Sequence, residues 1–292
     1  MTIHSKSVSL VLGSGGARGL AHIGVIHWLE ENGYEIRSIS GSSMGALVGG
    51  IYAAGKLDTY VQWVRSITKL DIVTLLDLSW GISGLVKGDK IINTLVELVG
   101  DSLIEDLPIS YTAVAADIEG EKEIWINTGR LFDAIRASIS LPLIFTPFDY
   151  HGTLLIDGGV LNPVPIAPTF GDNTDLTIAV NLGGPSAEIH RQAIQRENPD
   201  EQDSDLHANI NRFIKSLQKS VLSEGKNDWA VYDVAIQAFE AMQSTIARQK
   251  LAAYPPDLTI EIPRNACRTL EFDRADEMIR LGYAKAQQVM LS

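Results

Sequence analysis

The sequence of 292 residues contains a single cysteine, Cys267. A lone cysteine cannot form an intrachain disulfide, and it excludes a metal site built from paired cysteines. One cysteine in a chain of this length also fits a reducing compartment. We therefore expect a core held together by packing, with no metal and no cofactor.

Long apolar runs and a leader-like N-terminus are missing as well. No stretch reaches the roughly 18 uninterrupted apolar residues that a membrane-spanning helix needs. The first residues, Met1 to Ser7, have no cationic segment followed by an apolar run of signal length. We therefore expect a cytoplasmic protein, and any contact with a membrane would be peripheral.

Positive charge is scarce. The chain has 24 Lys and Arg residues against 36 Asp and Glu residues, which gives a net charge of −12. Nucleic-acid binding requires a basic face, so this balance argues against a nucleic-acid partner. In other respects the composition is that of a globular protein, with 45% hydrophobic and 21% charged residues. The sequence says nothing about the oligomeric state.

Apolar runs and glycine-rich turns alternate along the chain and indicate an α/β protein. Strands are predicted at 7–12, 36–40, 111–116, 123–126, 153–156, 176–181 and 258–262. Helices are predicted at 21–31, 46–54, 89–99 (with Asp89 as its N-cap), 131–139, 229–250 and 273–291. The early strands and helices alternate, which is typical of a parallel sheet with crossover helices.

The pattern indicates one domain over residues 1–292. Its core is expected over about 8–185, and its C-terminal helical part over about 206–292. Between them, residues 186–205 are rich in acidic side chains and poor in aliphatic ones, which predicts a solvated surface excursion. The sequence contains no internal repeat.

The sharpest local motif is Gly41-Ser42-Ser43-Met44-Gly45, which matches the G-x-S-x-G pattern of a nucleophile elbow. A nucleophile on a sharp strand-to-helix turn needs strained backbone angles, and glycines two residues to either side let the chain turn that closely. The motif lies between a predicted strand and a predicted helix, which is the context that supports Ser43 as a nucleophile. The alternative is an ordinary Gly/Ser turn.

A second glycine-rich segment, Gly13 to Gly19, also joins a predicted strand to a predicted helix. Backbone N–H groups at such a place can bind an anion. An oxyanion hole is the favoured interpretation. A dinucleotide loop is less favoured, because no acidic residue ends a second strand about 20 residues later. A tight turn without a ligand is the remaining alternative.

The general base is less obvious than the nucleophile. The histidines are His4, His22, His27, His151, His190 and His207, and none lies where a catalytic imidazole is expected. Asp157 ends a predicted strand and precedes Gly158 and Gly159, so its carboxylate could reach the same sheet edge as Ser43. An ionised carboxylate within hydrogen-bond reach of a serine hydroxyl can act as the base. An Asp that merely closes a turn is the alternative.

Taken in order, the glycine loop, the Ser43 elbow and the Asp157-Gly158-Gly159 segment resemble the patatin-like phospholipase family. Further similar segments are Leu20 to Val25, Gly84 to Asp89, Arg136 to Pro142, Asp157 to Pro165 and Arg274 to Ala286. The resemblance covers about residues 8–180 well and the tail loosely. It implies a three-layer α/β/α fold with a mainly parallel central sheet.

The resemblance also implies a function and a set of site residues. It implies a Ser43–Asp157 dyad that hydrolyses carboxylic esters of lipids, as a phospholipase A, lysophospholipase or esterase does. The elbow glycines Gly41 and Gly45 and the pair Gly158 and Gly159 belong to the motifs. By position, the oxyanion loop is Gly15, Gly16, Ala17, Arg18 and Gly19. The alternatives are a weakly catalytic or non-catalytic regulatory protein on the same fold and, less favoured, a nucleotide-binding oxidoreductase.

Overall fold

The computed structural model describes residues 5–75, 88–187 and 226–292. The chain forms two compact units, one of Met1–Ala187 with Met242–Ser292 and one of Glu188–Ala241. The expected acidic excursion at 186–205 lies outside the described residues from position 188 onward, as do His190 and His207. The expectation of one domain over the whole chain stays a prediction.

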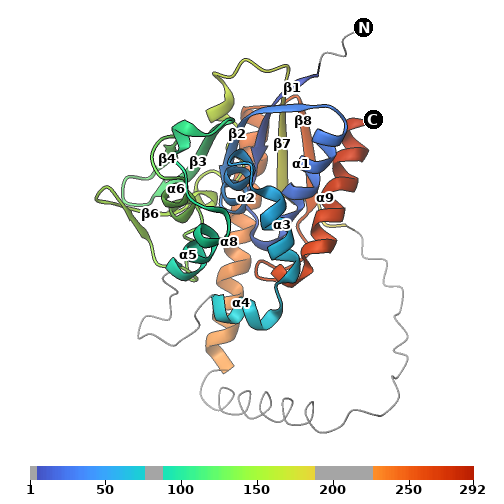
Figure 1. Cartoon of the computed structure of the whole chain (residues 1–292). Helices are drawn as coiled ribbons and strands as arrows, with labels where there is room; N and C mark the ends of the chain where they lie inside the picture. The colour runs from blue at the N-terminus through green and yellow to red at the C-terminus, as the bar shows by residue number, and fades with distance from the viewer. Residues whose placement is uncertain (1–4, 76–87, 188–225) are drawn as a thin grey trace, which may run out of the picture. The chain divides into compact units, whose positions relative to one another are not determined.

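A mixed sheet forms the centre of the first unit (Figure 1). Its strands run in the order β5-β6-β3-β2-β1-β7-β8, and β4 pairs with β3. The strand bounds are β1 Ser7–Leu12, β2 Glu35–Ser42, β3 Ser110–Asp117, β4 Lys122–Ile126, β5 Phe148–Tyr150, β6 Thr153–Asp157, β7 Leu176–Gly184 and β8 Leu258–Pro263.

The sheet is mostly parallel, as the sequence predicts. Four parallel pairings join β3 to β2, β2 to β1, β1 to β7 and β7 to β8. The antiparallel pairings involve β4, β5 and β6 and lie at one edge. Short turns join β3 to β4 and β5 to β6, whereas β4, α6 and β5 lie between β3 and β6, and β6 pairs with β3 in the reverse direction. Asp157 therefore lies at the end of a strand that runs opposite to β2.

Helices cover the sheet, and those predicted from the sequence have closely similar bounds in the structure. The α-helices are α1 Ala21–Glu31, α2 Met44–Ala53, α3 Leu57–Ser66, α4 Lys69–Leu75, α5 Asp89–Val99, α6 Leu131–Ser138, α8 Lys226–Ala253 and α9 Ala275–Met290. Short 3₁₀ helices are η1 Gly16–Leu20, η2 Ile104–Asp106, η3 Gly158–Val160, η4 Ala167–Thr169 and η5 Phe272–Arg274. The predicted elements differ from these bounds by at most three residues at either end.

Strand β1 shows how the sheet is buried on both faces. Leu10 and Leu12 belong to a large apolar cluster that also contains residues of α1, α2 and α9. Val11, which points to the opposite face, packs in a second cluster with Ala179 and with Ala247 of α8. Layers of helix on both faces explain why β1 is buried along its length, and they give the expected three-layer α/β/α arrangement.

Helices α1 and α9 lie side by side on the larger cluster (Figure 1). A Cβ atom at Gly24 would lie 1.9 Å from the carbonyl oxygen of Ile279, and one at Gly282 would lie 1.9 Å from that of Ala21. Glycine at both positions lets the two backbones touch. This contact fixes the C-terminal helix to the first helix of the chain.

Two expectations differ from the structure. Helices α3 and α4 and the short strand β5 lie in stretches for which no element is predicted. Asp89 is the first residue of α5 and not its N-cap, which is Gly88 with a φ of 72°. A left-handed backbone angle suits glycine, and no side chain caps this helix. Within the described residues, no helix is both long and apolar enough to span a membrane.

Candidate active site

Ser43 occupies the turn between β2 and α2. Strand β2 ends at Ser42, α2 begins at Met44, and Ser43 has a φ of 55° and a ψ of −123°. A positive φ at a residue with a side chain stores about 1–3 kcal/mol of strain and persists only where packing enforces it. The strand-to-helix turn and its strained residue are those expected of a nucleophile elbow.

Close backbone contacts explain two of the motif glycines. A Cβ atom at Gly45 would lie 2.0 Å from the carbonyl oxygen of Leu12, where α2 passes the end of β1. At Gly158, a Cβ atom would lie 2.0 Å from the carbonyl oxygen of Val114. The absence of side chains therefore lets the Ser43 turn and the Asp157 turn approach the same edge of the sheet.

The sheet register brings Ser43 and Asp157 together across β3. Ser42 of β2 is paired with Val114, and the next residue of β3, Ala115, is paired with Asp157 of β6. The Oγ atom of Ser43 donates a hydrogen bond of 2.5 Å to Oδ2 of Asp157. The two residues are separated by 114 positions in the sequence and meet only in the folded sheet.

The Asp157 carboxyl group is buried, with no exposed surface. Burial disfavours its ionised form and raises the pKa of Asp157 to about 7, although hydrogen bonds from Ser43 and from the Gly159 backbone N–H act in the opposite direction. The Gly159 N–H lies 2.7 Å from Oδ1. Both carboxylate oxygens therefore have a donor, and the group can exchange a proton near neutral pH.

Residues at the end of α6 hold the backbones of both candidate residues. The Ser138 hydroxyl accepts a hydrogen bond of 2.9 Å from the Ser43 N–H and donates one of 2.6 Å to the carbonyl oxygen of Val114. The Ser140 carbonyl oxygen accepts a hydrogen bond of 3.0 Å from the Asp157 N–H. The Ser43 N–H is thus occupied and cannot contact a substrate oxygen.

The glycine loop has a more specific arrangement than the sequence suggests. Within the described residues, the N–H groups of Gly15 and Gly16 donate to no protein acceptor. By contrast, the Ala17 N–H donates to the Thr269 carbonyl oxygen at 2.8 Å. Gly19 packs on Met44, whose Cβ atom would lie 2.3 Å from a Cβ atom at that position.

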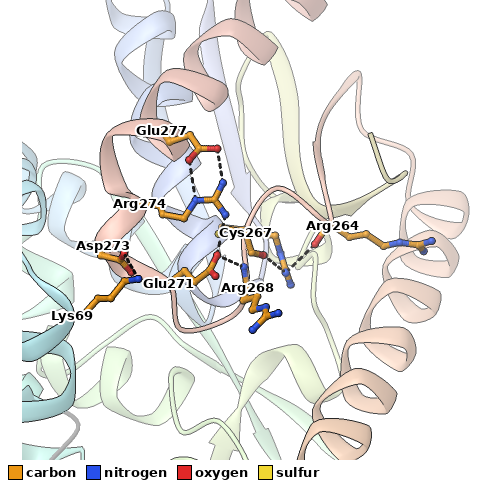
Figure 2. A network of polar contacts seen from close by, with 9 residues as sticks. Lys69, Arg264, Cys267, Arg268, Glu271, Asp273, Arg274 and Glu277 are labelled. Carbon is orange, nitrogen blue, oxygen red and sulfur yellow. Dashed lines mark hydrogen bonds and ion pairs between the residues drawn. The ribbon is translucent and has the colours of Figure 1, made fainter. Parts of the chain in front are cut away.

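Arg18, the other member of this loop, is not a surface charge. Its side chain is buried, and Nη1 donates hydrogen bonds of 3.0 Å to the carbonyl oxygens of Arg264 and Cys267. Figure 2 labels Arg264 and Cys267, the residues whose carbonyl oxygens accept these hydrogen bonds. Arg18 therefore ties the glycine loop to the segment that follows β8.

The described histidines contribute no imidazole to this pair. His22 is buried with Nε2 2.8 Å from the Gly13 carbonyl oxygen, and burial lowers the pKa of His22 to about 4. It stabilises the start of the glycine loop as a neutral side chain. His151 lies in the turn between β5 and β6 and packs edge-on against Tyr150. Among the described residues, no group of three or more His, Cys, Asp or Glu side chains could hold a metal ion.

An apolar cavity opens beside Ser43. The open space between its walls, counted together with solvent at its mouth, is about 780 Å³. Ser43 and Gly16 line it together with side chains from α2, α3, α4, α5, the segment after α6, and the segment between β8 and α9. These are Met44, Leu47, Tyr60, Trp63, Val64, Ile67, Ile72, Leu75, Ile91, Leu95, Ile139, Leu141, Ile144, Phe145, Thr269, Leu270 and Phe272. No charged side chain of the described part of the chain lines it.

The sequence reasoning missed several contributors to this site. Ser138 lies in a segment that resembles the family but received no individual role, and its hydrogen bonds depend on how α6 packs against β3. The cavity residues Thr269, Leu270 and Phe272 come from a part of the chain with no recognisable motif. Their only sequence signal is a pair of apolar residues in an otherwise charged stretch.

Comparison with known proteins places the chain in a family. The family model described as patatin-like phospholipase matches residues 10–170. An uncharacterized NTE family protein of Mycobacterium tuberculosis is 39% identical, over 98% of this chain and 92% of that protein. The lysophospholipase NTE1 of Kluyveromyces lactis is 28% identical, over 97% of this chain.

This chain spans 19% of the length of the Kluyveromyces lactis protein, so the similarity concerns one region of a larger relative. Among solved structures, VipD from Legionella pneumophila is similar with a TM-score of 0.44 and 14% sequence identity, over 97% of this chain and 66% of that one.

Proposed function

The chain belongs to the patatin-like phospholipase family and is a lipid acyl hydrolase, and from this premise we propose that Ser43 and Asp157 are its catalytic dyad. The observation that carries the proposal is the hydrogen bond of 2.5 Å from Ser43 Oγ to Asp157 Oδ2, at the wall of an apolar cavity. The pair supplies a nucleophile and a base, and the cavity accepts an acyl chain.

In the first half of the reaction, ionised Asp157 takes the proton of Ser43 as Oγ attacks the ester carbonyl carbon. The tetrahedral intermediate collapses, the bond to the alcohol oxygen breaks, and Asp157 returns the proton to the leaving alcohol. An acyl-enzyme ester on Ser43 remains. A pKa of Asp157 near 7 supports both roles, because the group can accept and release a proton at neutral pH.

The oxyanion of the intermediate needs donors aimed at it, and we assign these to the glycine loop Gly15–Gly19. The N–H groups of Gly15 and Gly16 are the best candidates, because they donate to no acceptor within the described part of the chain. The N–H of Met44, directly after the nucleophile at the start of α2, is a third candidate. In this assignment Ala17, Arg18 and Gly19 shape the loop and do not donate.

The second half of the reaction frees the enzyme. A water molecule attacks the acyl-enzyme carbonyl as Asp157 removes one of its protons. The bond to Ser43 Oγ then breaks, Oγ takes the proton back, and a fatty acid leaves. This sequence consumes one water per ester and needs no other reactant.

The cavity suits the acyl chain of a lipid ester. Its lining is apolar, so an acyl chain gains by entering and a charged head group would have to stay outside. The fungal relatives are named lysophospholipases, which favours a lysophospholipid as the first natural substrate to test. The cytoplasmic location, the peripheral membrane contact and the absence of a nucleic-acid partner stay predictions.

Hydrolysis of p-nitrophenyl acyl esters of increasing length tests the dyad, with Ser43→Ala and Asp157→Asn compared with the parent protein. Ser42→Ala is a matched control, because the adjacent Ser42 hydroxyl is buried without a hydrogen-bond partner in the described structure. We expect turnover to disappear in both dyad variants and to persist in Ser42→Ala. Turnover that survives Ser43→Ala would refute the proposal, whereas absence of turnover in the parent protein would favour the regulatory alternative on the same fold.

A further inference from the structure

The C-terminal loop, residues 264–272, closes one side of the candidate cavity from outside the region that the family model matches. It runs from the end of β8 at Pro263 into η5, whereas the match ends at residue 170. Thr269, Leu270 and Phe272 of this loop line the cavity together with Ser43 and Gly16. A part of the chain with no recognisable family motif therefore contributes to the wall beside the nucleophile.

The loop lies directly on the glycine loop. A Cβ atom at Gly16 would lie 2.5 Å from the carbonyl oxygen of Thr269 and 2.6 Å from its methyl carbon. The same carbonyl oxygen accepts the hydrogen bond from Ala17. Thr269 therefore borders the place where the reacting carbonyl is proposed to bind, and the residues after it extend the wall from that place.

Buried and paired charges hold the C-terminal loop in one position. The buried Arg18 guanidinium binds the carbonyl oxygens of Arg264 and Cys267 at its start. At its end, Arg274 binds Glu271 at 2.9 Å, and Glu271 also accepts the Arg268 N–H at 3.0 Å (Figure 2). Because the C-terminal loop is held at both ends, we expect it to move little when an acyl chain of a different length binds.

Further contacts extend this frame to the neighbouring helices. Arg274 also pairs with Glu277 of α9, with Nε 2.9 Å from a carboxylate oxygen. Lys69 of α4 lies 3.7 Å from Asp273, next to Phe272. Helix α4 itself lines the cavity through Ile72 and Leu75, so the loop and this helix meet at the cavity wall.

We propose that the C-terminal loop sets the acyl-chain length that the enzyme accepts, through Phe272 and Leu270. This inference rests on the proposed function, since it assigns the cavity to an acyl chain. Leu270 is 37% exposed, which places it where the cavity meets solvent, whereas Phe272 is partly buried. A bulky ring at Phe272 limits the space available, and the apolar side chain of Leu270 binds the part of the chain that reaches the mouth.

The test measures kcat/KM for p-nitrophenyl esters of short, medium and long acyl chains. For Phe272→Ala we expect the optimum to move to longer chains, by about fourfold in kcat/KM for each methylene newly accommodated, at about 0.8 kcal/mol per buried methylene. Phe272→Trp should move the optimum to shorter chains. Leu270→Ala should lower kcat/KM for the longest chains alone, mainly through KM.

Matched controls separate the loop from a general loss of apolar surface. Leu103→Ala and Phe170→Ala remove side chains that are 43% and 63% exposed and do not line the cavity. Neither should change the ratio of long-chain to short-chain kcat/KM. Thermal unfolding of each variant shows whether it is folded, and the exposed Leu270 keeps the test available if Phe272→Ala is unstable.

Two kinds of failure remain distinguishable. If turnover depends on Ser43 but the chain-length profile is the same in the parent, Leu270→Ala and either folded Phe272 variant, the inference about the loop is wrong and the dyad stands. If turnover does not depend on Ser43, the proposed function fails first and the cavity loses its assignment.

Discussion

The backbone N–H of Ser43 is held by the hydroxyl of Ser138, 2.9 Å away, and that hydroxyl in turn donates to the carbonyl oxygen of Val114. Ser138 is buried at the end of α6 and touches the nucleophile only through its backbone. It is therefore a positioning residue: it helps to fix the strained turn that presents Oγ to Asp157.

Ser138→Ala should lower kcat by roughly 10-fold to 100-fold with little change in KM, because a displaced nucleophile loses its alignment while the cavity stays intact. The free energy of unfolding should fall by about 1–3 kcal/mol, since two buried backbone groups lose their partner. Steady-state kinetics and chemical denaturation check both values. Ser66→Ala serves as the control, because it removes an exposed hydroxyl that donates a hydrogen bond to the Trp63 carbonyl oxygen. A rise in KM at constant kcat would contradict the positioning role.

The pH dependence of turnover should report the ionisation of Asp157. Because burial raises the pKa of Asp157 to about 7, its base form is scarce at acidic pH. We expect kcat/KM to rise about tenfold per pH unit below about 7 and to level off above it, as for a single essential base of the free enzyme. A profile measured from pH 5 to pH 9 tests this. A plateau that extends down to pH 5 would mean that Asp157 is not the base.

The same raised pKa predicts that Asp157→Asn stabilises the protein at alkaline pH. The folded chain binds this proton more tightly than the unfolded chain, whose reference pKa is 3.8. The contribution of this carboxyl group to the free energy of unfolding is therefore fully present below about pH 4 and is lost as the pH rises through about 7. Asparagine stays neutral and avoids that loss, which amounts to about 4 kcal/mol at most.

The effect is measured by thermal unfolding of the parent protein and of Asp157→Asn at pH 4.5 and pH 8.5. We expect both proteins to be folded at these two pH values. The variant should gain stability relative to the parent as the pH rises. Asp149→Asn is a suitable control, because Asp149 is an exposed residue of β5. An equal difference in unfolding temperature at both pH values would contradict the raised pKa.

Gly282→Ala should separate α9 from α1. The added Cβ atom would lie 1.9 Å from the backbone carbonyl oxygen of Ala21, which is far inside contact distance and cannot be relieved by a side-chain rotation. We expect a loss of about 1–3 kcal/mol or more in the free energy of unfolding. Gly171→Ala, where an added Cβ meets nothing within 4 Å, is the matched control. Equal denaturation midpoints for the two variants would show that the helices tolerate a wider spacing.

Local pattern alone was sufficient for many elements and for the two reactive groups. The strand 7–12 and the helix 21–31 have the predicted bounds, because each is defined by residues that are close together in the sequence. The amphipathic helix α3 was overlooked, although Leu57, Tyr60, Val61 and Val64 are buried on one face. Ser43 and Asp157 could be proposed because each has a short glycine-flanked motif; their pairing as a dyad came from the family resemblance, and their roles stay a proposal.

By itself the sequence determined most of the strands and helices, the family and the short list of reactive side chains, because these follow from spacing between near neighbours. The tertiary structure decided what those side chains meet: Asp157 across β3 from Ser43, Ser138 behind the nucleophile, and Arg18 against the carbonyl oxygens of Arg264 and Cys267. Sheet order and the direction of β6 create these contacts between distant parts of the chain. The burial that shifts the pKa of Asp157 arises the same way, because desolvation depends on everything packed around a group rather than on its neighbours in sequence.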